Sequence, residues 1–384
     1  MINNYHYEIM KKIYFPIIIV VIVLIGVLIL SNKSVNNKTI KIGVATLLNG
    51  DYAALGENIV DTLKLRIDEI NDNGGIRGKE IELVVEDSGL SGKDGLSAMS
   101  KLINVDKVKY IIAGMTSNGT LASADLINTS HTITMVPVTG GSNIDKAGQY
   151  IFRVGNSDVL AGRDIAKQII SMGYKRIGIV SEVTEYTQDI ANSFLNTLNE
   201  SHKDIVINER FEPNTKDFKT LVNKVVKANP QAIVVLSQTG TNAALFIKQL
   251  REMRLSVKIF TDFTLATNSS VKDILGSMNS IYFADPMYSN DSKMINFTSK
   301  YKDKYNRDPF IAFHSAATID SVDLIISAIS NVGDDSVLVQ DWLSHKVVNY
   351  DGYMGRFSLD SLGNSDLGFR IKYIDNDKIV EINQ

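Results

Sequence analysis

From Thr39 onward the sequence alternates between short apolar runs and longer segments with helical spacing. The short runs have the length of strands and few polar interruptions, as in Ala-Ile-Val-Val-Leu at 232–236. Strands that are covered by helices on both faces have this continuous apolar character, whereas half-exposed strands alternate. The pattern therefore predicts an α/β protein with largely parallel sheets. We expect strands at 40–46, 81–86, 110–113, 134–138, 176–180, 205–211, 232–236 and 258–261.

These elements divide into two series of similar content. A break near residues 153–158 separates the two groups of β-α-β units, which favours two smaller sheets over one large sheet. After Pro286 the chain returns to helices, at 294–305 and 312–330, and then ends in a predicted strand pair at 355–359 and 369–373. We therefore predict two Rossmann-like lobes, each with a parallel-rich sheet and helices on both faces. The chain is expected to cross between them more than once, and such crossings form a hinge.

An uncharged apolar run occupies residues 13–30, directly after the pair Lys11 and Lys12. As a helix it would be about 27 Å long, which is close to the thickness of a bilayer core. The lysines before it predict a cytoplasmic tip, a transmembrane signal-anchor and, after a polar linker that ends at residue 38, a body outside the cytoplasm. A cleaved signal peptide is the alternative, which would give a secreted body. No A-x-A-like site follows the run, so we favour an anchor in the cell membrane.

Composition excludes several classes of function. The chain has no cysteine, which excludes disulfides, thiolate metal sites, thiol catalysis and a lipid-modified cysteine anchor. Its 40 basic and 43 acidic residues are spread along the chain, which argues against nucleic-acid binding. The five histidines are scattered, and neither a G-x-S-x-G elbow nor a phosphate-binding loop is present. We expect a protein that is not an enzyme and uses neither a metal nor a cofactor.

Polar turns follow three of the predicted strands at the point where each strand ends. They are Gly-Met-Thr-Ser-Asn-Gly-Thr at 114–120, Thr-Gly-Gly-Ser-Asn at 139–143 and Glu-Val-Thr-Glu-Tyr-Thr at 182–187. Ligands of open α/β sheets bind at the carboxyl ends of strands, where backbone N–H groups and hydroxyls hold anions. Taken alone, each turn also fits an ordinary helix cap.

Several of these segments resemble one known family. The most specific part is Gly-Asp-Tyr-Ala-Ala-Leu-Gly at 50–56, followed by Ile-Asn-Asp-Asn-Gly-Gly-Ile-Arg-Gly-Lys at 70–79. The strand before the serine turn, Lys-Asp-Phe at 216–218 and His-Ser-Ala-Ala-Thr-Ile-Asp at 314–320 add to the similarity. From about Lys41 to its end, the chain resembles the branched-chain amino-acid-binding (Leu/Ile/Val-binding) proteins of bacterial ABC transporters and their wider family of type I periplasmic binding proteins.

This resemblance implies a fold of two lobes joined by three crossings, which close on a ligand like a trap. Lobe 1 is expected to comprise residues 39–154 and 286–350. Lobe 2 is expected to comprise residues 155–285 and 351–384.

The resemblance also implies a set of ligand-binding residues. Ser117 matches a serine that contacts the ligand's α-ammonium or carboxylate, and Tyr186 matches an aromatic residue that closes over the ligand. Leu55 lies where many members have a tyrosine, which is a departure from the family. The segment whose backbone N–H groups and hydroxyl hold the carboxylate matches Gly140, Gly141 and Ser142, and a further contact segment includes Gln238 and Thr239.

The acidic partner of the ligand's α-ammonium is ambiguous. Asp262 is the nearest candidate after the strand at 258–261, but the alignment fits Thr264 equally well. A buried ammonium without a carboxylate is costly. If Thr264 holds that place, the ligand is not an α-amino acid.

Two functions fit this resemblance. The first is an extracytoplasmic substrate-binding protein that takes an amino acid of branched-chain type, or a similar small polar solute, to the permease subunits of an ABC transporter. The alternative is a membrane-anchored sensing or scaffold protein that uses the same domain to signal to a partner. A second membrane helix and an output domain would mark the alternative, and the sequence up to Gln384 contains neither.

Overall fold

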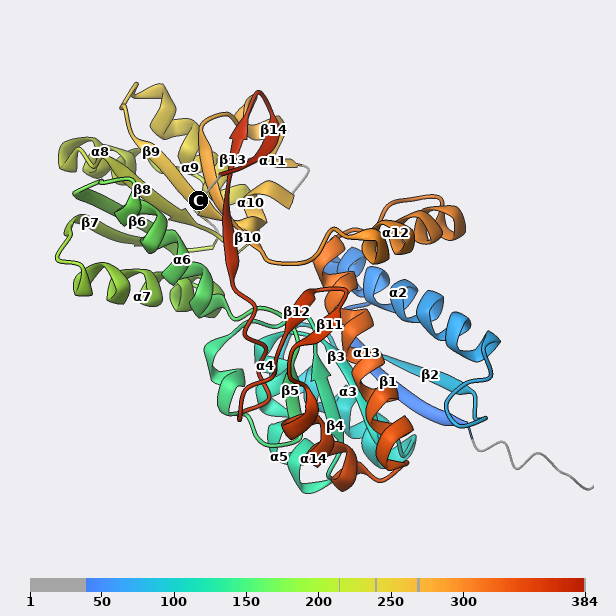
Figure 1. The fold of residues 1–384 in the computed structure, drawn as a ribbon. Helices are drawn as coiled ribbons and strands as arrows, with labels where there is room; N and C mark the ends of the chain where they lie inside the picture. The colour runs from blue at the N-terminus through green and yellow to red at the C-terminus, as the bar shows by residue number, and fades with distance from the viewer. Residues whose placement is uncertain (1–38, 214, 239, 268–269, 383–384) are drawn as a thin grey trace, which may run out of the picture.

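The computed structural model describes residues 39–213, 215–238, 240–267 and 270–382. The predicted membrane segment at 13–30 and the predicted site residue Thr239 lie outside the described residues. The described chain forms two α/β lobes, which lie one above the other in Figure 1. This arrangement confirms the prediction of two lobes with parallel-rich sheets.

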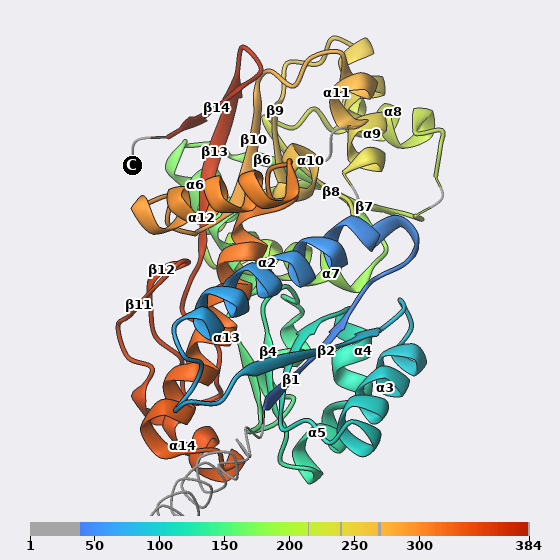
Figure 2. The same ribbon diagram turned by 90° about the vertical axis from the view of Figure 1, so that its right-hand side faces the viewer.

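Lobe 1 is built on a five-stranded sheet in the order β2-β1-β3-β4-β5. Its neighbouring strands are all parallel, and helices cover both faces (Figure 2). The strands are β1 (Ile40–Thr46), β2 (Ile81–Asp87), β3 (Tyr110–Gly114), β4 (Ile133–Val136) and β5 (Ile151–Arg153). The helical elements are η1 (Gly50–Tyr52), α2 (Ala53–Asp72), α3 (Gly92–Ser100), η2 (Lys101–Val105), α4 (Ser117–Ala122), α5 (Ala124–Thr129), η3 (Ser142–Lys146), α12 (Ser292–Tyr305), α13 (Ala312–Val332) and α14 (Ser336–Lys346).

Helix α13 is the central helix of lobe 1. In the described part of the chain it is the one helix with the length and hydropathy for a membrane span, but 78% of its apolar window is buried inside the protein. Its residues Ile319, Val322 and Ile325 pack in the same core as the strands β1, β3 and β4. We therefore assign its apolar character to the core of lobe 1.

Lobe 2 is built on a seven-stranded sheet in the order β14-β13-β10-β9-β8-β6-β7. The strands from β10 to β7 are parallel, and β13 and β14 add to them in antiparallel fashion. The strands are β6 (Arg176–Glu182), β7 (Asp204–Phe211), β8 (Ala232–Leu236), β9 (Lys258–Asp262), β10 (Ile281–Pro286), β13 (Phe369–Asp375) and β14 (Lys378–Glu381). The helices are α6 (Asp158–Ser171), α7 (Glu185–Glu200), α8 (Lys219–Ala228), α9 (Thr241–Glu252), α10 (Phe263–Thr267) and α11 (Ser270–Leu275).

The sequence of strand β8 lacks polar positions because both faces of the strand are buried. Successive side chains of a strand point to opposite faces of the sheet. Ile233 and Val235 pack in the core on one face, whereas Ala232, Val234 and Leu236 pack in the core on the other. Because helices cover both faces, every position of the strand is buried and apolar.

The chain passes between the lobes three times. The first crossing joins β5 to α6, the second joins β10 to α12, and the third leads into β13. Next to the crossings, β5 pairs with the segment before β13 by backbone hydrogen bonds, from Arg153 N to Gly363 O and from Ser365 N to Arg153 O, both of 2.9 Å. The crossings themselves meet at Gly368 O, which accepts from Asn156 Nδ2 at 2.6 Å and from Met287 N at 3.0 Å, so all three run side by side.

The end of the chain differs from the predicted strand pair at 355–359 and 369–373. Strand β12 (Gly355–Phe357) pairs with β11 (Tyr350–Gly352), whereas β13 pairs with β10 and β14. The buried residues Met354, Phe357 and Leu367 pack in the core of lobe 1. The third crossing therefore comes after Leu367, later than the boundary expected at residue 350.

A buried carboxylate holds the turn between β11 and β12 in place. Asp320, on α13, accepts hydrogen bonds from the backbone N–H groups of Tyr353 and Met354, each of 2.7 Å. A Cβ on Gly352 would overlap this carboxylate, so the close approach requires a glycine there. The turn between β11 and β12 is thus tied to the core helix of lobe 1.

We expect Asp320→Ala to lower the free energy of unfolding by about 1–3 kcal/mol, because two buried N–H groups lose their acceptor. Hydrogen exchange of the full chain in detergent should show lost protection at Tyr353 and Met354. Asp351→Ala is the control, since Asp351 is exposed and forms a surface ion pair with Lys293 at 3.2 Å. Its effect should stay below about 1 kcal/mol. Unchanged exchange at Tyr353 and Met354 in Asp320→Ala would contradict this role.

Candidate functional site

The serine turn and the glycine turn of lobe 1 lie against each other. Ser117 is the first residue of α4, and Thr116 caps this helix by accepting a hydrogen bond from Gly119 N at 3.1 Å. A Cβ on Gly141 would lie only 2.7 Å from the hydroxyl oxygen of Ser117. The glycine is therefore needed for the two turns to pack together.

Arg153 fixes the orientation of the glycine turn. Its guanidinium is 2% exposed and forms an ion pair with Asp145 at 2.5 Å. Its Nη1 donates to the carbonyl oxygens of Gly140 and Gly141, at 3.3 and 3.5 Å. The two carbonyl groups are thus bound to Arg153.

The acidic candidate of lobe 2 lies at the carboxyl end of β9. Asp262 is 1% exposed, and its Oδ1 accepts hydrogen bonds from Thr264, from the backbone N at 2.8 Å and from the side-chain hydroxyl. The Thr264 hydroxyl also lies 2.9 Å from Ser237 O. The other carboxylate oxygen, Oδ2, is buried and has no hydrogen-bond partner among the described residues. Thr264 therefore supports Asp262 and leaves one carboxylate oxygen of Asp262 available.

An aromatic row connects the two lobes beside Asp262. The rings of Tyr186 and Phe263, both from lobe 2, meet edge to face with centroids 6.4 Å apart. Phe263 in turn meets Phe313 of lobe 1 at 5.1 Å. Burial raises the pKa of the Tyr186 phenol, and the charges of Asp262 and Asp158 and a side-chain hydrogen bond with Asp262 raise it further. The phenol is thus a direct neighbour of the Asp262 carboxylate.

Asp189 of α7 bonds directly to the glycine turn of lobe 1. The backbone N–H of Ser142 donates to Asp189 Oδ2 at 2.8 Å, and the Ser142 hydroxyl donates to Oδ1 at 3.1 Å. A second contact between the lobes runs from Asn143 Nδ2 to Glu185 Oε1 at 3.3 Å. Both donors of Ser142 are therefore bound to one carboxylate of lobe 2.

Asp158 adds a further carboxylate at the start of α6. It is 8% exposed, and burial raises its pKa to about 8, against the favourable effect of Arg153. The charges of Asp189, Asp262 and Glu185 raise this pKa further. Burial likewise raises the pKa of Asp262 to about 6, against its hydrogen bonds from Thr264.

These residues form one group, which is named the interlobe site. Lobe 1 contributes the serine and glycine turns, and lobe 2 contributes the carboxylates, the phenol and the supporting threonine. The members are Ser117, Gly140, Gly141, Ser142, Asp158, Tyr186, Asp189, Asp262 and Thr264.

Two other predicted residues have different surroundings. The backbone N–H of Gln238 donates to the buried carboxylate of Glu182 at 2.8 Å, which ties the loop after β8 to the end of β6. Leu55 is half-buried on α2 and packs against the core of lobe 1. Among the described residues, these contacts do not link Gln238 or Leu55 to the carboxylates of the interlobe site.

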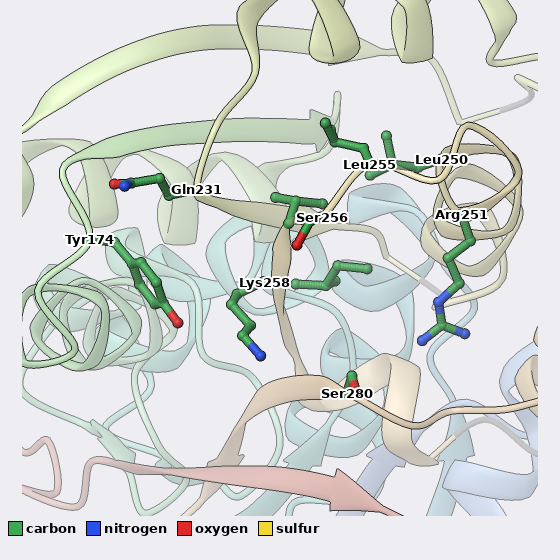
Figure 3. A pocket seen from close by; sticks show the side chains of 10 residues that line it. Tyr174, Gln231, Leu250, Arg251, Leu255, Ser256, Lys258 and Ser280 are labelled. Carbon is green, nitrogen blue, oxygen red and sulfur yellow. The ribbon is translucent and has the colours of Figure 1, made fainter.

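A hollow of about 460 Å³ lies elsewhere on lobe 2 (Figure 3). It is lined by residues at or before the starts of the strands, including Tyr174, Gln231, Lys258 and Ser280. Ligands of open α/β sheets bind at the opposite, carboxyl ends of the strands. The interlobe site lies at those carboxyl ends and is the stronger candidate.

A family described as periplasmic binding protein matches residues 39–360, which include the interlobe site and the strands of both sheets except β13 and β14. The chain belongs to the periplasmic binding protein family. Its relatives in this family are solute-binding proteins, in agreement with the predicted resemblance.

Individual relatives have amino-acid binding in their names. An amino acid binding protein of Pseudomonas aeruginosa is 24% identical over 352 residues, covering 88% of this chain and 90% of that protein. The Leu/Ile/Val-binding protein BraC3 of Rhizobium johnstonii is 26% identical over 222 residues. That second match covers 57% of this chain and spans 60% of the relative's length.

Solved structures share the fold over most of the chain. The branched-chain amino acid substrate-binding protein LivJ of Streptococcus pneumoniae, in complex with isoleucine, has a TM-score of 0.77 and 26% identity, covering 89% of this chain and 98% of that one. A solute-binding protein of R. palustris in complex with 4-hydroxybenzoate has a TM-score of 0.79 at 18% identity, covering 90% of this chain and 96% of that one. The second likeness shows the fold alone.

Two carboxylates of the interlobe site, Asp158 and Asp189, are not among the residues that the sequence of this periplasmic binding protein predicts. Asp189 lies inside α7, on the turn after Tyr186, and its partner Ser142 is on the other lobe. Asp158 opens α6, where an acidic residue is also an ordinary feature of a helix start. The one signal for them in the sequence is their position. Asp189 follows the predicted turn at 182–187, and Asp158 lies at the predicted break near 153–158.

We expect stability to depend on pH through Asp158. Its folded-state pKa of about 8 is higher than the value near 4 in an unfolded chain, so the folded protein holds the extra proton between these values. This stabilisation is complete below about pH 4 and is lost at about 1.4 kcal/mol per pH unit as pH rises towards 8. In Asp158→Asn, the free energy of unfolding should therefore decrease less steeply as pH rises from about 5 to 8.

The measurement is a series of unfolding curves of the full chain in detergent at several pH values. Asp125→Asn is the matched control, because Asp125 is exposed on α5. The control should keep the slope of the original protein. The same slope in Asp158→Asn would contradict a raised pKa for Asp158.

Proposed function

We propose that this chain is the substrate-binding component of an ABC transporter and holds a small solute with an amino group between its lobes. The class includes amino acids of branched-chain type. The observation that carries the proposal is the buried carboxylate of Asp262, which has Thr264 and the Tyr186 phenol beside it but no cationic partner among the described residues. An isolated buried carboxylate is unfavourable, and an ammonium group relieves that cost by pairing with it.

The support of Asp262 favours this role. Thr264 donates two hydrogen bonds to Oδ1, which fixes the carboxylate at the end of β9. Ligand-binding groups act best when their neighbours hold them in place before the ligand arrives. Asp262 thus has the properties of a prepared partner for a cation, and Thr264 has those of its support.

Closure of the lobes supplies the mechanism that we propose. Ser117 belongs to lobe 1, whereas Asp262 and Tyr186 belong to lobe 2, so a solute that contacts all three is held best when the lobes are together. A ligand shifts the population towards the state that it binds better. The closed, liganded form is then the form that a permease recognises. The names of the relatives, which include Leu/Ile/Val-binding proteins, support an amino-bearing solute.

We expect Asp262→Asn to weaken binding of amino-bearing solutes by at least about tenfold, because truncating one partner of a buried charge pair costs 2 kcal/mol or more. Thermal shift and calorimetry of the full chain in detergent, with amino acids, amines, amides and sugars, would measure the loss. Binding to the folded state raises the melting temperature.

Asp273→Asn is the control for this experiment, because Asp273 is an exposed carboxylate of α11 in the same lobe. It should bind like the original protein. Equal binding by Asp262→Asn would remove Asp262 from the site. A chain that binds no solute at all would favour the sensing or scaffold function.

The apolar run at 13–30 supports a membrane anchor as part of the same proposal. An anchor keeps the binding domain beside the permease outside the cytoplasm. We expect the full chain to stay in the membrane pellet after alkaline carbonate washing, because a spanning helix of this length does not dissociate. Removal of residues 1–38 should release it. A processed chain that starts near residue 31 and is found in the soluble fraction would instead indicate a cleaved signal peptide.

A further inference from the structure

Two anion-binding groups of the glycine turn, the N–H and the hydroxyl of Ser142, are already occupied by the chain itself. Ser142 directs its N–H and its hydroxyl to the two oxygens of Asp189, at 2.8 and 3.1 Å. This two-point contact is the geometry with which such a turn would hold a carboxylate group. Asp189 is covalently part of lobe 2, so it reaches Ser142 at high effective concentration whenever the lobes meet.

A free carboxylate is poorly placed in this site for a second reason. The negative charges of Asp189 and Asp262 lie close enough to Asp158 to raise its pKa. The cation that acts on Asp158 is Arg153, and its guanidinium is engaged by Asp145 and by the carbonyl oxygens of Gly140 and Gly141. An incoming anion would therefore meet the charges of Asp189 and Asp262, whereas the guanidinium of Arg153 is already paired with Asp145.

A cation would meet groups that attract it in the same site. Asp262 is buried and has no cationic partner among the described residues, and its carboxylate lies beside the phenol of Tyr186. The rings of Tyr186 and Phe263 stand next to it, and aromatic rings attract cations as well as apolar groups. The site thus offers a carboxylate to an ammonium group and an aromatic surface to the rest of the solute.

We propose that the interlobe site selects an amine that carries a positive charge and has no free carboxylate. The ligand class is a primary amine or an amino-acid amide with a short aliphatic or aromatic side chain. Asp189 takes the place at Ser142 that the carboxylate of an amino acid would otherwise occupy. This inference rests on the proposed function, since it names the chemical class of the solute.

The test uses two matched series of compounds with the full chain in detergent. The first series is isopentylamine, leucinamide, leucine and isocaproate, which share a side chain and differ in the charged groups. The second is phenethylamine, phenylalaninamide, phenylalanine and hydrocinnamate. We expect the amine and the amide of at least one series to bind at least about tenfold more tightly than the amino acid, because a like-charge contact costs over 1.4 kcal/mol. The acids should not bind.

Asp189→Ala tests the residue that is responsible. The substitution frees both donors of Ser142 and removes one negative charge, and alanine is fully compatible with the interior of α7. We expect the preference for the amide over the amino acid to fall by about tenfold or more, mainly through tighter binding of the amino acid. Glu200→Ala, at the exposed end of the same helix, is the control and should keep the original preference.

The outcomes separate this inference from the function on which it rests. Tighter binding of leucine or phenylalanine than of their amides overturns the inference but leaves an amino-bearing solute in place. An unchanged preference in Asp189→Ala overturns the role of Asp189. If neither series binds but a sugar or another solute does, both the ligand class and the amino-bearing solute are wrong. Binding of the amines and amides, with the preference lost in Asp189→Ala, supports the inference.

Discussion

One buried guanidinium organises the junction of the two lobes. Arg153 is the last residue of β5, at the point where the chain leaves lobe 1, and it is 2% exposed. It holds the carbonyl oxygens of the glycine turn on one side and the carboxylate of Asp145 on another. The donors of Ser142 consequently remain available to lobe 2, where they meet Asp189. Gly140 O also accepts from Asp158 N at 2.9 Å and Gly141 O from Ile144 N at 3.1 Å, so the guanidinium reinforces a turn that backbone hydrogen bonds already shape.

The carboxylates around this junction are unfavourable for the protein on its own. Burial raises the pKa of Asp158 to about 8 and that of Asp262 to about 6, so the folded state disfavours both negative charges. A bound cation would offset this effect, and the chain would gain stability from the same contacts that hold the solute. Groups that destabilise the free protein in this way are common at binding sites, where function and stability compete.

The sequence was sufficient for the architecture because local patterns determine it. The apolar run of β8, with each face buried in a different core, is typical of a parallel strand under two layers of helices. The pairing of β12 depended instead on a distant residue, Asp320, whose contact with the turn at Tyr353 cannot be read from local spacing. The interlobe site likewise combines features that local sequence shows with contacts between distant residues that it does not show. Polar turns after strands are visible in sequence, but the contact of Asp189 with Ser142 exists only once two lobes are placed together.

The meeting of the three crossings at Gly368 has a consequence for how the lobes move. Because Gly368 O accepts hydrogen bonds from Asn156 of the first crossing and from Met287 of the second, the crossings cannot slide past one another without breaking hydrogen bonds. Bending of all three together keeps these bonds. Rotation of one lobe against the other about an axis through the crossings is therefore the relative motion that costs least, and opening proceeds by hinge rotation and not by shear.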